Sequence, residues 1–181
     1  LPHCQISRYI EDRVNNFLRQ KLDENDPEIE VIIRVLSSSD KEVEVKPHMF
    51  KKYVASGYPE RFAYRSKAIF AFEVLKDPDT GISTEVCFFG LYVQEYGTNC
   101  AQPNQRRVYI AYLDSVHFFQ PRHLRTSVYY EILLGYLQVE EFILFFFSGT
   151  VWGLPANILF IEKLQKAKMM ENEKIMYVKR L

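Results

Sequence analysis

The stretch "YRSKAIFAFEVLKDPDTGISTEVCFFGLYVQEY" (residues 64–96) carries the strongest structural signal in the chain, because it predicts two long strands joined by one turn. Residues 64–75 alternate between two sets of side chains, as the two faces of a strand require. Residues 85–96 form a second apolar run of strand length. Between the two runs, residues 76–83 supply the Asp, Pro and Gly typical of a turn. The whole stretch therefore predicts a β-hairpin.

The flanking segments extend this hairpin into a layered domain. "EVIIRVL" (30–36) and "KEVEVK" (41–46) predict another hairpin that turns at "SSSD" (37–40), and "RRVYIAYL" (106–113) predicts a mostly buried strand. Short turns between strands favour antiparallel pairing. The fold class is therefore α/β, a central mixed, largely antiparallel sheet flanked by helices. Helical patterns occur at residues 8–22, from Pro121 onward and at 161–181.

The charge balance, the apolar runs and the cysteine and histidine content argue against several kinds of partner. The 181 residues suit one domain, and 23 basic residues balance 23 acidic ones, so no overall field favours nucleic acid or a membrane surface. The longest apolar run, at 142–147, is too short to span a bilayer. Three scattered cysteines indicate reduced thiols in an intracellular compartment, and with four histidines they form no metal-ligand pattern. We expect no metal, no direct nucleic-acid partner and no membrane.

One corner of the chain suggests a phosphate-bearing ligand. Asp114-Ser115 ends a strand, and Arg125-Thr126 follows at the opening of a helix, where free N–H groups and the helix dipole attract anions. An alternative interpretation is that Asp114 or Ser115 only caps a turn and that Thr126 bonds its own helix backbone. Asp114 is the only acid between Gln105 and Thr126, among the basic residues Arg106, Arg107, His117, Arg122, His123 and Arg125.

The same region carries a family resemblance. Residues 93–137, "VQEYGTNCAQPNQRRVYIAYLDSVHFFQPRHLRTSVYYEILLGYL", closely resemble the catalytic core of the CREB-binding protein family of histone acetyltransferases. Residues 11–20 ("EDRVNNFLRQ"), 39–47 ("SDKEVEVKP") and 64–73 ("YRSKAIFAFE") resemble the same family. The resemblance runs nearly continuously over 8–138, about three quarters of the chain.

The resemblance implies a histone and protein lysine acetyltransferase that takes its acetyl group from acetyl-CoA and acts as a transcriptional coactivator in the nucleus. It implies histone tails and other lysine-bearing proteins as partners, with transcription factors bound through a longer parent. Tyr112, Leu113 and Asp114 match the family's histone-binding segment, and Trp152 corresponds to its tunnel tryptophan. The implied acetyl-CoA contacts are Leu113, Asp114, Ser115, Arg125 and Thr126.

The C-terminal part departs from the family pattern. The family places a Trp-Tyr pair after a segment that "KLQ" (163–165) resembles, but Lys166-Ala167-Lys168 follows here, so no catalytic residue is assigned. We interpret 1–181 as a single incomplete acetyltransferase domain, with a family-like core at 8–138 and a divergent tail at 139–181. The alternative to an active enzyme is a catalytically inactive, truncated paralogue that binds only acetyl-CoA or partner proteins.

Overall fold

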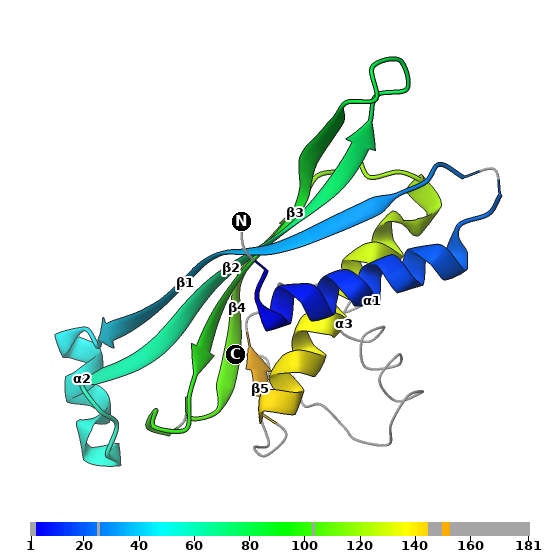
Figure 1. The fold of residues 1–181 in the computed structure, drawn as a ribbon. Coiled ribbons are helices and arrows are strands. Elements are labelled where there is room, and N and C mark those ends of the chain that lie inside the picture. Colours follow the sequence, from blue (N-terminus) through cyan, green and yellow to red (C-terminus); the bar gives the residue numbers. More distant parts are fainter. Residues whose placement is uncertain (1–2, 25, 103, 145–149, 153–181) are drawn as a thin grey trace. The chain divides into compact units, whose positions relative to one another are not determined.

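The computed structural model describes residues 3–24, 26–102, 104–144 and 150–152 (Figure 1). Its helices are α1 (Gln5–Lys21), α2 (Pro47–Tyr53) and α3 (Arg122–Leu144), with a 3-10 turn η1 (Val54–Ser56) after α2. Its strands are β1 (Glu30–Glu44), β2 (Arg61–Lys76), β3 (Ser83–Tyr96), β4 (Arg107–Ser115) and β5 (Thr150–Trp152).

The strands form one mixed sheet in the order β1-β2-β3-β4-β5. The first four strands pair antiparallel, and β5 pairs parallel to β4, with Arg107 opposite Thr150 and Tyr109 opposite Trp152. Helices flank this sheet. The predicted fold class, an α/β protein with a largely antiparallel mixed sheet, is confirmed.

The predicted hairpin at 30–46 is wrong, because residues 30–44 form the single strand β1. "SSSD" does not turn; it continues the strand, and its Asp40 carboxylate accepts from Arg65 on β2 at 2.8 and 3.2 Å. Turn-forming residues remain extended when a neighbouring strand supplies the partners. The short helix α2 was not predicted, and the helix expected at 161–181 lies outside the described residues.

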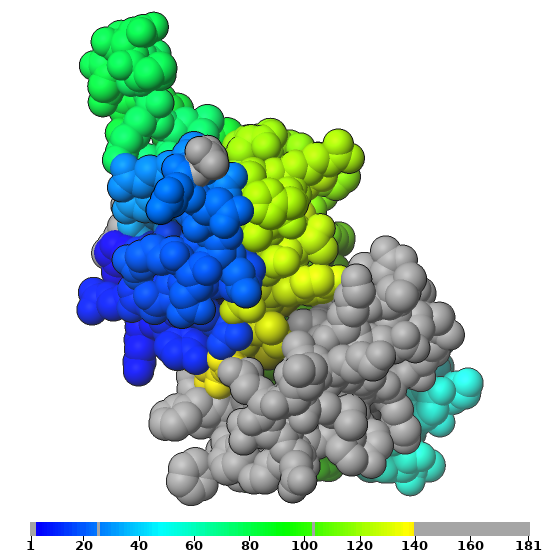
Figure 2. All heavy atoms as spheres, turned by 90° about the vertical axis from the view of Figure 1, so that its right-hand side faces the viewer, coloured from blue at the N-terminus to red at the C-terminus, as the bar shows by residue number. Residues whose placement is uncertain are grey.

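The turn between β2 and β3 is confirmed, and it projects from the end of the hairpin (Figures 1 and 2). Asp77 Oδ1 accepts from the backbone N–H groups of Thr80 (2.8 Å) and Asp79 (2.9 Å). These bonds hold the pKa of Asp77 below its ordinary value. Gly81, at φ +69°, provides the left-handed conformation that lets the chain return.

The chain divides into two compact units. The first comprises Leu1–Leu36, Ala68–Leu91 and Tyr112–Ile143, and the second comprises Ser37–Lys67, Tyr92–Ala111 and Leu144–Leu181. The first unit therefore contains α1, nearly all of α3 and the strand-end corner. The second unit contains α2, η1 and β5.

In the first unit, α1 and α3 pack against each other (Figure 1). The α1 side chains Ile10, Val14 and Leu18 recur at intervals of four residues and are at most 1% exposed. A Cβ atom at Gly135 of α3 would lie 3.3 Å from side-chain atoms of both Ile10 and Arg13. The absence of a side chain at Gly135 is what lets the helices approach this closely.

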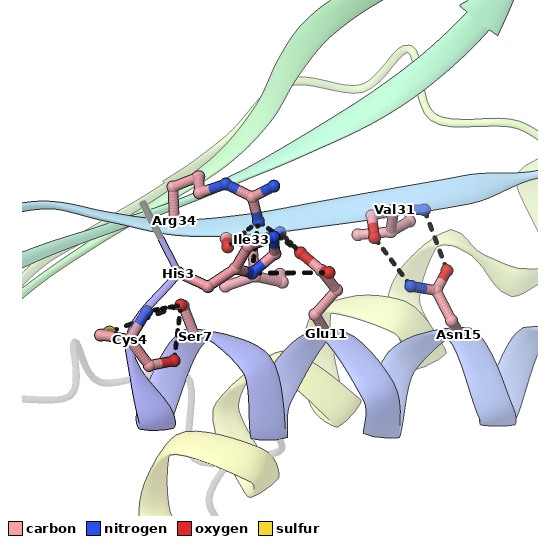
Figure 3. A network of polar contacts seen from close by, with 8 residues as sticks. All are labelled: His3, Cys4, Ser7, Glu11, Asn15, Val31, Ile33 and Arg34. Atoms are coloured by element: carbon pink, nitrogen blue, oxygen red, sulfur yellow. Dashed lines mark hydrogen bonds and ion pairs between the residues drawn. The ribbon is translucent and has the colours of Figure 1, made fainter. Parts of the chain in front are cut away.

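Side chains of α1 also bind the backbone of β1 (Figure 3). The Asn15 amide donates to the Val31 carbonyl oxygen at 2.8 Å and accepts from the Val31 N–H at 2.9 Å. Glu11 Oε2 accepts from the Ile33 N–H at 2.8 Å and from Arg34 Nη1 at 2.6 Å. These bonds satisfy backbone groups that a neighbouring strand would otherwise satisfy.

Asn15→Ala should therefore lower the free energy of unfolding by about 2 kcal/mol, because it leaves the buried N–H and C=O of Val31 without their partner. Chemical denaturation with a fluorescence readout measures this loss. Asn16→Ala is the matched control, since the exposed Asn16 side chain accepts a hydrogen bond from Arg19 on the same helix and makes no hydrogen bond to the backbone of β1 among the described residues. Equal losses from the two variants would contradict the role assigned to Asn15.

Candidate functional site

The predicted corner lies in the first unit, where β4 ends and α3 begins. Tyr112, Leu113, Asp114 and Ser115 are the last four residues of β4, and alternation puts Leu113 and Ser115 on one face of the strand. Tyr112 lies on the opposite face with Asp114 and is 74% exposed. Arg125-Thr126 follow within the first turns of α3.

Tyr129 of α3 joins the two sides of this corner. Its hydroxyl donates to the Val116 carbonyl oxygen at 3.0 Å and hydrogen-bonds with the Ser115 side chain. Its ring stacks on Phe88 with centroids 6.0 Å apart and lies 5.6 Å from the Phe89 ring. The Tyr129 ring therefore packs α3 against β3, and the Tyr129 hydroxyl bonds α3 to the end of β4.

Arg125 forms a second connection, because its Nη1 donates to the His117 carbonyl oxygen at 2.7 Å. A guanidinium has five N–H donors, so this bond leaves others for a ligand. Asp114 instead makes a local bond, with its Oδ1 accepting from the Ser115 N–H at 2.8 Å. The structure thus brings Ser115 and Arg125 to a common neighbour, while Thr126 is exposed and Asp114 caps the backbone beside it.

The charges around Tyr129 act in both directions on its proton. Burial raises the pKa of the Tyr129 hydroxyl, the Ser115 side chain and the Arg125 charge lower it, and Glu73 raises it further. Since the net direction is upward, the phenol stays protonated at neutral pH.

Glu73 of β2 is a buried acid beneath the loop that joins β4 to α3. It is 3% exposed, and its carboxylate accepts from the Gln120 backbone N–H. Its Oε2 atom has no hydrogen-bond partner among the described residues. Burial raises the pKa of Glu73, because the charged form loses water.

Sequence reasoning missed both Tyr129 and Glu73. Tyr129 lies one helical turn after Arg125, a spacing that places two side chains on the same face of a helix. Glu73 is the acid in an alternating strand whose other inward positions are Ile69 and Ala71. An acid in such a position is the signal that would have identified it.

Other predicted residues lie elsewhere. Trp152 belongs to β5 in the second unit. Arg106 and Arg107 also lie in the second unit, outside β5. Among the described residues, no three His, Cys, Asp or Glu side chains gather closely enough to hold a metal ion. No helix in the described part of the chain has the length and apolar character needed to cross a membrane.

Comparisons with known proteins agree on one family. Residues 14–158 match the histone acetyltransferase domain KAT3. Protein cbp-1 of Caenorhabditis elegans is 54% identical over 158 residues, which cover 87% of this chain and 8% of that protein. The probable histone acetyltransferase HAC-like 2 of Oryza sativa subsp. japonica is 42% identical over 173 residues, covering 86% of this chain and 12% of that protein. Histone acetyltransferase HAC1 of Arabidopsis thaliana is 40% identical over 173 residues, covering 86% and 10%.

The chain therefore belongs by descent to the histone acetyltransferases, a class of acyltransferase enzymes. Within this class it is a member of the family defined by the KAT3 domain, the CREB-binding protein family that the sequence resemblance predicted. It spans only about a tenth of the length of the curated relatives named above.

Glu73→Gln should change how stability depends on pH. The raised pKa of Glu73 means that its contribution to stability is fully present below the unfolded-state pKa and is lost as pH rises through the folded-state pKa. The side chain of the variant cannot ionise. Its free energy of unfolding should therefore be about 1 kcal/mol higher than that of the wild type at pH 8, and this difference should shrink toward pH 4. Denaturant titrations at several pH values measure it, and a difference that grows on acidification would contradict the assignment.

Tyr129→Phe should loosen the corner without emptying the core, because the ring contacts with Phe88 and Phe89 remain while the hydroxyl bonds disappear. We expect a loss of about 1 kcal/mol in unfolding free energy. Tyr9→Phe is the control, since the Tyr9 hydroxyl bonds Gln138 at an exposed site. A Tyr129→Phe variant as stable as that control would show that the hydroxyl does not fasten the corner.

Proposed function

We propose that this chain binds acetyl-CoA at the strand-end corner and transfers the acetyl group to lysine ε-amines of histone tails and other proteins. The observation that carries the proposal is that hydrogen bonds from two side chains of α3 reach the end of β4 and the loop after it. Tyr129 hydrogen-bonds with the Ser115 side chain and the Val116 carbonyl oxygen, and Arg125 donates to the His117 carbonyl oxygen. In a chain of this family, these bonds hold the Arg125 guanidinium, which can bind an anion, in a fixed position near the end of β4. Action in the nucleus as a transcriptional coactivator, with transcription factors bound through a longer parent, is part of the same proposal.

The residues of the corner have the chemistry that coenzyme A phosphates require. Arg125 offers a planar, permanently charged fork, and the first turn of α3 contains no acid to oppose an anion. Ser115 adds a hydroxyl, and Leu113 and Thr126 lie at the same strand end and helix start. Tyr112, which is 74% exposed, and Asp114 are the positions proposed to contact a protein substrate.

Acetyl transfer needs groups beyond this corner. The neutral lysine amine attacks the thioester carbonyl carbon, the carbon–sulfur bond breaks, and the departing thiolate is helped by a general acid. Tyr129 does not suit that role, because its proton is donated to the Val116 carbonyl oxygen. The proposal therefore places the acid outside the corner, and it keeps Trp152, which matches the family's tunnel tryptophan, as a substrate-binding residue.

A second candidate function is binding without catalysis. It is favoured by the replacement of the family's Trp-Tyr pair, because Lys166-Ala167-Lys168 follow "KLQ" at residues 163–165. In this version the family-like core at 8–138 binds acetyl-CoA or a protein partner, and the tail at 139–181 does not complete an active site.

The first test is ligand binding. Coenzyme A at 100 times its dissociation constant should stabilise the chain by ~2.7 kcal/mol, read as a rise in melting temperature. Arg125→Ala should remove most of this rise, whereas Arg19→Ala, which removes an exposed charge on α1, should keep it. A rise that survives Arg125→Ala would contradict the placement of the phosphates.

The second test is turnover, measured by mass spectrometry of a histone tail peptide incubated with acetyl-CoA and the chain. Transfer that Arg125→Ala abolishes and Arg19→Ala retains is the outcome expected of an enzyme. Stabilisation by coenzyme A without transfer would identify the non-catalytic binder. The absence of both would overturn the proposed function.

A further inference from the structure

The second unit contains a hollow that the acetyl-CoA corner does not use. It has a volume of ≈ 510 Å³, and α2, the segment after it and the loop between β3 and β4 form its walls. We call it the α2 groove. The described side chains that line it are mainly aromatic and apolar, among them Met49, Phe50, Tyr53, Tyr58 and Phe62, and Gln102 adds a polar amide.

The walls of the α2 groove are held in place by hydrogen bonds within the second unit. The Val45 N–H donates to the Glu60 carbonyl oxygen at 2.8 Å, which closes the segment that carries α2. On the other wall, the Arg106 N–H donates to the Gly97 carbonyl oxygen at 3.2 Å. Tyr53 and Tyr58 also meet edge to face, with ring centroids 6.0 Å apart. The groove is thus a formed site, as ligand-binding hollows usually are.

Helix α2 leaves its apolar side chains in contact with solvent. None of its residues is buried, and Met49 is 41% exposed, Tyr53 37% and the nearby Tyr58 39%. A seven-residue helix has little stability of its own and normally depends on an apolar face that is covered. Clustered exposed apolar side chains beside a hollow mark an interaction site.

Charge identifies the kind of partner. The two wall segments, residues 45–59 and 97–106, contain no Asp or Glu, although acids and bases are equal in number over the whole chain. The same segments carry the cations Lys46, Lys51, Lys52 and Arg106. The structure gives the exposed lysines Lys46, Lys51 and Lys52 no ion pair with any described residue.

Two acids flank the wall segment at residues 45–59, and one of them is already paired with a cation. Glu44 pairs with Arg61 at 3.2 Å, and Glu60 lies just beyond the wall segment. Lys52 Nζ instead lies 5.2 Å from the centroid of the Tyr53 ring, so a cation stands beside the aromatic wall. An apolar hollow edged by cations complements a partner with the opposite charges and bulky apolar side chains.

We propose that the α2 groove docks an acidic peptide segment of a partner protein, whose Leu- and Phe-type side chains enter the hollow while its carboxylates face Lys51 and Lys52. This inference does not depend on acetyl-CoA binding, because the groove and the strand-end corner have no residue in common. It gives the chain a protein-binding site in addition to any catalytic one.

The test uses the full 181-residue chain and a fluorescein-labelled peptide of about 15 residues in which Asp and Glu alternate with Leu and Phe. Two matched peptides replace either every acid by Lys or every apolar residue by Ser. Fluorescence anisotropy at ~0.15 M ionic strength should show binding of the first peptide alone, and this binding should weaken as salt is added. Equal binding of the basic peptide, or no binding of the acidic one, would overturn the proposal.

Charge-reversal variants place the interaction on the groove. Lys51→Glu with Lys52→Glu should weaken binding about tenfold or more, since two exposed attractions become repulsions. Arg19→Glu with Lys21→Glu makes the same change at the exposed end of α1 and should leave affinity unchanged. All four positions are exposed, so both double variants should fold, which circular dichroism verifies.

Phe50→Ala tests the apolar half of the proposal and should also weaken binding. A second copy of this chain is the other partner that could fill the groove, and analytical ultracentrifugation of the chain alone tests for it. Self-association that the Lys51→Glu, Lys52→Glu variant abolishes would assign the groove to a second copy of the chain and overturn the partner-peptide proposal.

Discussion

The close approach of α3 to α1 at Gly135 is the constraint on which the first unit depends. With no side chain at Gly135, Ile10 and Arg13 of α1 lie against the α3 backbone, and Arg13 reaches Glu131 at 2.6 Å. The same helix carries Val128 into the core and Tyr129 onto Phe88. The position of the candidate ligand-binding corner is therefore a result of helix packing at Gly135, which lies about three helical turns after Arg125.

The elements that could be predicted from the sequence are those with local causes. The hairpin at 64–96 follows from alternation and from Asp, Pro and Gly in the turn, and α1 follows from apolar residues on one helical face. The strand at "SSSD" could not be predicted, because its partners are on β2, about 25 residues away. Helix α2 escaped prediction because it buries no residue and so has no periodic pattern to detect.

In the candidate site, too, residues with local signals could be predicted and residues that depend on distant contacts could not. Residue types and spacing were enough to select Ser115 and Arg125 as neighbours of a strand end and a helix start. They could not select Tyr129 as the group between them, because its contacts come from β3 and from the loop after β4. For Glu73 the sequence shows an acid at an inward strand position, but its bond to the Gln120 N–H exists only in the folded chain.

The long strand β1 also affects how the protein behaves at high concentration. It lies at one edge of the described sheet, and the exposed backbone of an edge strand can template pairing with another molecule and so lead to aggregation. Its inner part is occupied, because Asn15 and Glu11 already bind the backbone of Val31 and Ile33. Its outer part carries alternating charges at 40–44, which repel or misalign an incoming strand. The residues that anchor α1 and the charges at 40–44 thus also protect this edge of the sheet from pairing with another molecule.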